Sequence, residues 1–219
     1  MYCGNLTFIP CREVEGIFIS KGLNAFWWSS SEVDSNNAWF RRLSYNYDYV
    51  VFSDTLKTNT TGSDNVAVGF RALSGNTTGS SNTAIGYNSL FANTSGATNS
   101  AFGYNTLSLN TTGFGNTAFG KGSLATNTTG AYNATLGQSA LEKNTTGNNN
   151  IGIGYQALVK NTTANDNVAV GSSSLFENVT GANNVAVGSN ALGATTSSSN
   201  SALGINAGAT NTTGTNNTY

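Results

Sequence analysis

The chain has 219 residues, of which 9% are charged, 26 are glycine, one is proline and none is histidine, and its net charge is −1. This composition is unlike that of an ordinary globular domain, and without a basic stripe it does not support a nucleic-acid partner bound through phosphates. The sequence contains no run of about 18 apolar residues that would span a membrane, and residues 1–15 do not resemble a signal peptide.

Residues 1–52 are predicted to be a separate module because they hold all three tryptophans. Apolar runs and alternation predict strands over 38–43 and 45–52. Its aromatic residues could line a glycan or peptide site, although we favour the core of a small β module; they are Trp27, Trp28, Trp39, Tyr45, Tyr47 and Tyr49. The two cysteines, Cys3 and Cys11, are compatible with either a disulfide or two free thiols.

The letters GLNAFWWSSSE at 22–32 and NAWFRRLSY at 37–45 resemble the Fibrobacter succinogenes major paralogous domain, a family of secreted and surface proteins. The resemblance implies a fold related to C-type-lectin-like modules. The upstream half of that family's pattern and its closing strand are missing here, so residues 1–52 are expected to form a partial domain. Residues 53–58 are predicted to be a junction.

Residues 59–219 repeat one seventeen-residue phrase, N-x-A-φ-G-x-x-[A/S]-L-x-x-N-T-T-G-x-x, in which φ is aliphatic or aromatic. Such a strict spacing indicates one structural unit per repeat. It predicts an all-β fold, a parallel β-solenoid of about nine coils. The last step is sixteen residues, and the chain ends two residues into a further phrase, so we expect it to be truncated at this end. The phrase starts at Asn65, Asn82, Asn99, Asn116, Asn133, Asn150, Asn167, Asn184 and Asn200.

Within one repeat, N-x-A-φ-G is too short for a helix and is predicted to be a brief strand. A second short strand is predicted at x-[A/S]-L-x. The glycine between them, Gly69 in the first repeat, suits a turn with positive φ or a close approach of backbones. The N-T-T-G segment then closes the coil.

Stacked coils are expected to bury two apolar ladders, and the row of alanines before φ then points to the opposite face of the strand. This alanine row predicts either a contact between chains, which we favour, or a tight corner within the chain. The ladder weakens where Gly208 replaces leucine. The first ladder is Val68, Ile85, Phe102, Phe119, Leu136, Ile153, Val170, Val187 and Leu203, and the second is Leu73, Leu90, Leu107, Leu124, Leu141, Leu158, Leu175 and Leu192.

Two further patterns lie outside these ladders. The N-T-T motif matches a glycosylation acceptor, but we favour a turn with stacked asparagine and threonine side chains. The aromatic residues Phe70, Tyr87, Tyr104 and Tyr155 follow the glycine in four repeats. They predict a partial stripe that serves as an interface.

No recurring group of side chains indicates chemistry. Only Asp64 and Asp166 occupy the turn where a calcium-binding β-roll repeats its aspartates, so no metal and no cofactor is predicted. Nucleophilic catalysis lacks a histidine base. We therefore expect that the protein is not an enzyme and has no catalytic residues.

The core N-x-A-[IVF]-G-x-x-[AS]-L resembles the head repeat of YadA-like trimeric autotransporter adhesins. Its seventeen-residue form is also similar to arrays found upstream of endosialidase-type chaperone domains. The resemblance implies a left-handed β-roll, a homotrimer and a place on the surface of a bacterium or phage. Our leading expectation is the head or shaft of a fibrous adhesin, with a host-surface or glycan receptor as partner.

Three alternatives remain open. The chain could belong to a phage-type tail fibre or chaperone-processed surface protein, which the sequence encoded after Tyr219 would distinguish from an adhesin. Residues 1–52 could bind a glycan while the repeats act as a spacer. The repeats could also be a monomeric, ice-binding solenoid.

Overall fold

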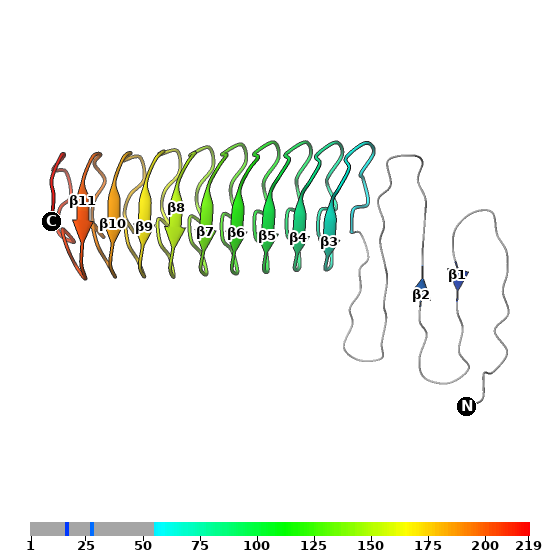
Figure 1. Cartoon of the computed structure of the whole chain (residues 1–219), viewed down its shortest axis with the longest axis horizontal. Coiled ribbons are helices and arrows are strands. Elements are labelled where there is room, and N and C mark those ends of the chain that lie inside the picture. Colours follow the sequence, from blue (N-terminus) through cyan, green and yellow to red (C-terminus); the bar gives the residue numbers. More distant parts are fainter. Residues whose placement is uncertain (1–15, 18–26, 29–54) are drawn as a thin grey trace, which may run out of the picture.

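The computed structural model describes residues 16–17, 27–28 and 55–219. Strands β1 (Gly16–Ile17) and β2 (Trp27–Trp28) pair antiparallel. The strands predicted over 38–43 and 45–52, and both cysteines, lie outside the described residues. From residue 55 onward the chain contains strands and turns but no helix, and Figure 1 shows it winding into successive coils of a rod.

The rod is a parallel β-solenoid, as the repeat predicts, and each coil contributes one strand to the sheet. Each strand pairs in parallel with the equivalent residues of the next coil, so Ala84 lies opposite Ala101. Paired residues are seventeen positions apart in the sequence, except between the last two strands, where they are sixteen apart. The nine strands are β3 (Val66–Val68), β4 (Thr83–Ile85), β5 (Ser100–Phe102), β6 (Thr117–Phe119), β7 (Ala134–Leu136), β8 (Ile151–Ile153), β9 (Val168–Val170), β10 (Val185–Val187) and β11 (Ser201–Leu203).

The inward and outward side chains of each strand are exchanged relative to the prediction. The alanine in the middle of the strand points inward, and Ala84, Ala101 and Ala118 are fully buried. The φ residue points outward, so that Leu136 is 55% exposed and Leu203 is 77% exposed. The predicted first ladder, from Val68 to Leu203, is therefore not a core ladder, and the alanine row is not a contact between chains.

The interior is narrow because the leucine ladder already fills it. Every leucine from Leu73 to Leu192 in the predicted second ladder is fully buried, which confirms that ladder. In the one coil with glycine in place of the inward alanine, a Cβ on Gly152 would lie 2.4 Å from Cδ1 of Leu141. The leucine thus reaches the underside of the strand, and the position above it holds only small residues, alanine in seven coils, the buried Thr135 in one and Gly152 in one.

The second predicted strand, at x-[A/S]-L-x, is wrong. This segment forms turns, and its leucines have left-handed backbones with φ between 48° and 54°. Such a backbone costs a non-glycine residue roughly 1 kcal/mol or more. The corner turns the leucine side chain into the core, and its N–H still donates to the next coil, as from Leu73 to the carbonyl oxygen of Ser89 at 3.0 Å.

The solenoid begins earlier than the sequence analysis predicts. Leu56 lies one step before Leu73, is only 8% exposed and has a φ of 50°. Its N–H donates to the carbonyl oxygen of Ala72 at 3.2 Å. Residues 55–58, predicted to be part of a junction, therefore belong to the first coil, and the letters T-L-K-T-N at 55–59 are a variant of the repeat's [A/S]-L-x-x-N.

Two ladders of buried asparagines run the length of the rod and confirm the interpretation of N-T-T as a stacked turn. In one ladder the side-chain amide of Asn127 donates to Oδ1 of Asn110 at 2.8 Å and to the carbonyl oxygen of Gly130 at 2.9 Å. In the other, the backbone N–H and side-chain amide of Asn116 both donate to Oδ1 of Asn99, at 3.0 and 3.1 Å. From Asn76 to Asn178 the first ladder is fully buried, so these amides are inaccessible to glycosylation in the folded coils.

The first asparagine ladder is interrupted once, at Thr195. Its hydroxyl donates to the carbonyl oxygen of Asn211 at 2.9 Å, and Oδ1 of Asn178 in the preceding coil is buried without a hydrogen-bond partner. An unpaired buried acceptor costs about 1–3 kcal/mol. The substitution Thr195→Asn places an amide donor beside this oxygen.

We expect Thr195→Asn to stabilise the solenoid by about 1 kcal/mol, the net value of one hydrogen bond. Chemical denaturation followed by circular dichroism measures this difference. Thr196→Asn is the control at the neighbouring exposed residue, whose hydroxyl donates to the carbonyl oxygen of Thr212 at 3.0 Å, and it should not raise the stability. Equal midpoints for the wild type and Thr195→Asn would contradict the ladder explanation.

The gap left by Gly208 in the leucine ladder is filled by another residue. A Cβ on Gly208 would lie 2.6 Å from the ring of Tyr219 and 2.9 Å from Cδ2 of Leu192. Tyr219 stands one repeat after the inward-facing Ala202. A large residue at the alanine position thus compensates for the missing leucine in the same layer.

Candidate interaction surfaces

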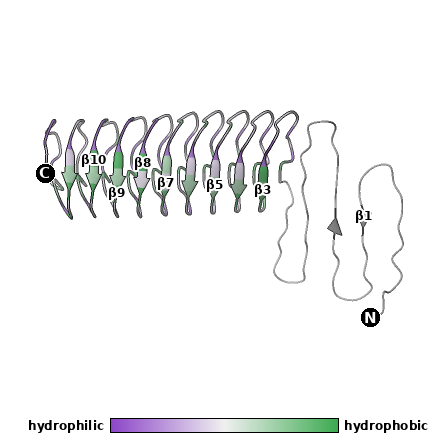
Figure 2. Cartoon of the chain, in the orientation of Figure 1, coloured by the Kyte–Doolittle hydropathy of each residue, from purple (hydrophilic) through white to green (hydrophobic). Residues whose placement is uncertain are grey.

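The outer face of the nine-stranded sheet is uncharged; its φ row is apolar, whereas its second row also contains Thr83, Ser100, Thr117 and Ser201. The face consists of the φ row and of the residue before each alanine, and neither row contains a charged side chain. Val66, Ile151 and Val185 of the second row are 49%, 37% and 41% exposed. Figure 2 shows that the apolar residues of the rod concentrate along the strands. A row of exposed apolar side chains of this kind is a candidate interaction site.

Direct contacts between coils hold this face in a regular array. The rings of Phe102 and Phe119 stack with centroids 4.4 Å apart and planes within 3° of parallel. The remaining members of the φ row are aliphatic. The face therefore presents one apolar side chain per coil at the spacing of neighbouring strands, about 4.8 Å.

A second exposed row consists of the residue that follows the turn glycine in each coil. Phe70, Tyr87 and Tyr104 stack with centroid distances of 5.4 and 5.1 Å, which confirms three members of the predicted aromatic stripe. Lys121 occupies this position in the next coil, with its Nζ 5.9 Å from the centre of the Tyr104 ring. Tyr155 lies two coils further on, so it is separated from the stack.

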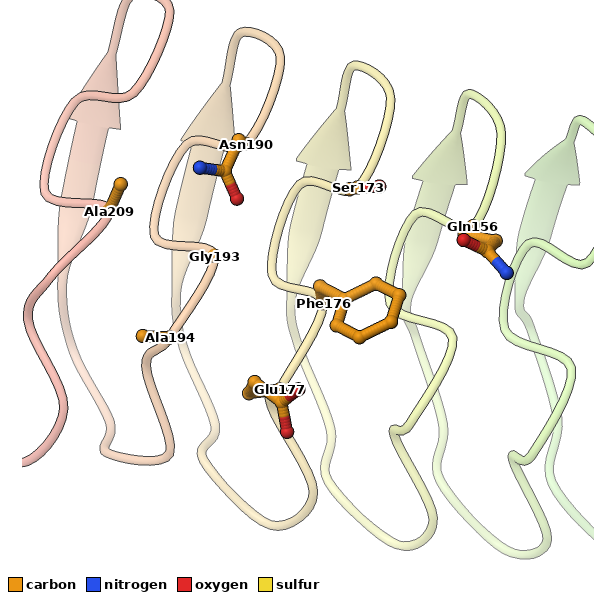
Figure 3. A pocket seen from close by; sticks show the side chains of 8 residues that line it. All are labelled: Gln156, Ser173, Phe176, Glu177, Asn190, Gly193, Ala194 and Ala209. Carbon is orange, nitrogen blue, oxygen red and sulfur yellow. The ribbon is translucent and has the colours of Figure 1, made fainter.

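A groove with a volume of about 490 Å³ lies further along the rod. Its lining comes from turns of four successive coils and includes Phe176, Glu177, Gln156 and Asn190. Figure 3 shows the Phe176 ring beside the groove, with Gln156 and Asn190 on turns that follow the strands. The sequence analysis did not predict this groove.

A pair of charged side chains lies at the edge of the groove. Lys160 Nζ donates to both carboxylate oxygens of Glu177 at 2.8 Å, across one coil step. Lys160 also lies 5.2 Å from the centre of the Phe176 ring. The ion pair fixes the Glu177 carboxylate and balances its charge.

The aromatic group near the N-terminus, for which a ligand site was the alternative to a β-module core, falls largely outside the described residues. Trp39, Tyr45, Tyr47 and Tyr49 are not described, and only the backbone of β2 is described at Trp27 and Trp28. Among residues 55–219 there is no cluster of three metal-ligating side chains. The described part of the chain also contains no helix that could cross a membrane.

The geometry defines a β-solenoid whose accessible features are the sheet face, an aromatic row and a groove. No protein-family model matches the chain, and no curated protein or solved structure matches it. The function must therefore be argued from these surfaces.

Proposed function

We propose that the chain is a non-enzymatic building block of a surface-exposed fibre, the head or shaft of a trimeric adhesin on a bacterium or phage. The observation that carries this proposal is the uncharged face along nine parallel strands, with an exposed or partly exposed apolar φ side chain in every coil. An exposed apolar patch of this size on a protein surface is often an interaction site. Another copy of the chain is the partner that this face suits best.

The periodicity of the face supports self-association. Each coil advances by the same strand spacing and carries one outward φ side chain, such as Ile85, Leu136 or Ile153. A second copy has the same spacing and therefore places an apolar side chain opposite every apolar side chain. A partner without this period would leave part of the row against polar groups, at a desolvation cost.

The size of the face favours a closed ring over a pair. With nine strands of three residues each, it measures about 10 Å by about 38 Å, or roughly 400 Å². A stable interface buries about 800 Å² on each partner. Each chain of a ring contacts two neighbours and can use both the sheet face and the adjoining aromatic row. Three chains are the number in the adhesin family that the repeat resembles.

Sedimentation of the purified chain tests the assembly directly. We expect a trimer that persists on dilution, because its interface is continuous along the rod. A folded monomer throughout a concentration series would overturn the proposal. This result would also count against the phage-type tail fibre, which resembles the adhesin in its trimeric shaft.

We expect Leu136→Lys to dissociate the assembly without unfolding the coil. The Leu136 side chain is 55% exposed in the single chain, so lysine there should change its stability by only about 0.5 kcal/mol. Within an apolar interface the same lysine is a buried charge without a partner, which costs about 3–5 kcal/mol. Sedimentation and circular dichroism measure the two effects separately.

The matched control is Thr146→Lys, which adds the same charge at an exposed turn residue away from the strands. It should sediment like the wild type. If Leu136→Lys and Thr146→Lys both remain assembled, the sheet face is excluded as the interface. If both dissociate to the same extent, the effect is a general one of added charge.

A further inference from the structure

The groove exists because side-chain size falls abruptly between neighbouring coils. Phe176 occupies the position after the ladder leucine, and the next two coils have Gly193 and Ala209 there. One residue further on, Glu177 is followed by Ala194 in the next coil. The wall of the groove is thus an aromatic ring, whereas its floor consists of backbone and methyl groups.

Polar groups with both donors and acceptors surround this apolar floor. Gln156 and Asn190 contribute side-chain amides, each of which donates and accepts hydrogen bonds. The Asn190 amide already donates to Oδ1 of Asn206 at 2.9 Å, which orients its own oxygen. Glu177 contributes a carboxylate that Lys160 holds in place. The lining therefore combines an aromatic surface with fixed polar groups and no unbalanced charge.

We propose that this groove binds a neutral oligosaccharide. A pyranose ring has a face of C–H groups that packs on an aromatic ring, and a rim of hydroxyls that donate to and accept from amides and carboxylates. The volume of about 490 Å³ lies within the range of about 300–1,000 Å³ for small-molecule sites. An acidic sugar is disfavoured because the Lys160 charge is already neutralised by Glu177.

The binding site is separate from the surface proposed for assembly. Its lining residues lie in the turns that follow β8 to β11 rather than on the strands. No lining residue belongs to the sheet face or to the aromatic row, although Gln156 directly follows Tyr155 of that row. Sugar binding and trimer formation therefore each have their own measurement.

The test uses the full chain and three neutral trisaccharides, namely maltotriose, cellotriose and N-acetylchitotriose, with sialyllactose as an acidic comparison. Saturation-transfer NMR detects binding, and titration gives the dissociation constant. We expect at least one neutral sugar to bind. Phe176→Ala should raise the dissociation constant of that sugar about tenfold, which is the loss expected for one aromatic contact.

Two further variants make the test specific to the groove. Ala194→Leu fills the floor with a residue that the same coil position already holds at Leu109, and it should weaken binding similarly. Phe91→Ala removes a phenylalanine from the position equivalent to Phe176, in a coil that does not line the groove, and it should bind like the wild type. Circular dichroism checks that all three variants fold.

Several results would overturn the proposal. They are the absence of binding by every neutral sugar, binding that survives both Phe176→Ala and Ala194→Leu, an equal loss in Phe91→Ala, and tighter binding of sialyllactose than of every neutral sugar.

Discussion

Replacing Gly120 by alanine is expected to destabilise the solenoid by about 3 kcal/mol or more. Gly120 has a φ of 122°, a region that is almost closed to residues with a Cβ. An added Cβ would lie 2.5 Å from the carbonyl oxygen of Gly137 and 2.7 Å from its carbonyl carbon. Both contacts are with backbone atoms of the next coil, so the strain cannot be relieved by rotating a side chain.

The damage should spread because neighbour contacts stabilise each coil of a solenoid. Separating β6 from β7 interrupts the sheet in the middle, and the two halves then unfold at different denaturant concentrations. Chemical denaturation followed by circular dichroism should show a lower midpoint and a broader transition for Gly120→Ala.

Gly122 provides a matched control two residues away in the same coil. Its φ is 68°, and a Cβ there would meet nothing closer than Oγ of Ser139 at 3.7 Å. Other coils place serine at this position, as at Ser139 and Ser173, each with a φ of 56°. Gly122→Ser should therefore change the stability by no more than about 0.5 kcal/mol. Equal losses in the two variants would refute the role assigned to the Gly120 position.

The second large effect is expected from Asn127→Ala, in the middle of a buried asparagine ladder. Asn127 donates to Oδ1 of Asn110 and accepts from the side-chain amide of Asn144, both at 2.8 Å. Alanine leaves that oxygen and that N–H buried without partners. At about 1–3 kcal/mol for each unpaired group, the total loss should be about 3 kcal/mol.

Thr129→Ala is the control for this variant, because Thr129 is an exposed residue of the same turn. It should change the stability by less than about 0.5 kcal/mol. Amide hydrogen exchange would locate the effect, with faster exchange in the coils on either side of Asn127. Equal stabilities for the two variants would show that the ladder contributes no more than a surface turn.

Much of the fold could be predicted because the repeat constrains it strongly. A constant step requires equivalent residues to stack, so the period predicted the parallel sheet and its register. The glycine after the strand was correctly predicted to need positive φ or close backbone contact, and the ladder leucines were correctly placed in the core. These features depend on what a residue type can do locally, and nine copies repeat the same information.

The groove was missed although the chain contains a signal for it. Aligning the repeats places Phe176, Gly193 and Ala209 in one column, where the loss of side-chain volume is visible. The features that the repeats share predict the fold, whereas the groove arises from a difference between them. The aromatic ligand site at residues 1–52, the alternative to a β-module core, remains a hypothesis, since most of it lies outside the described residues.

The sequence alone established the period, the parallel stacking, the turn glycine and the leucine ladder, because each follows from spacing or from the conformational limits of a single residue. Alternation along a strand shows that alanine and φ point to opposite faces, but it does not show which face is inside. That choice depended on the width of the coil. Left-handed corners turn leucines such as Leu141 beneath the strand, two asparagine ladders occupy more of the interior, and the remaining space holds only small side chains, alanine in most coils and Thr135 in one. The larger φ residues must therefore face outward, where they form the surface on which the proposed assembly depends.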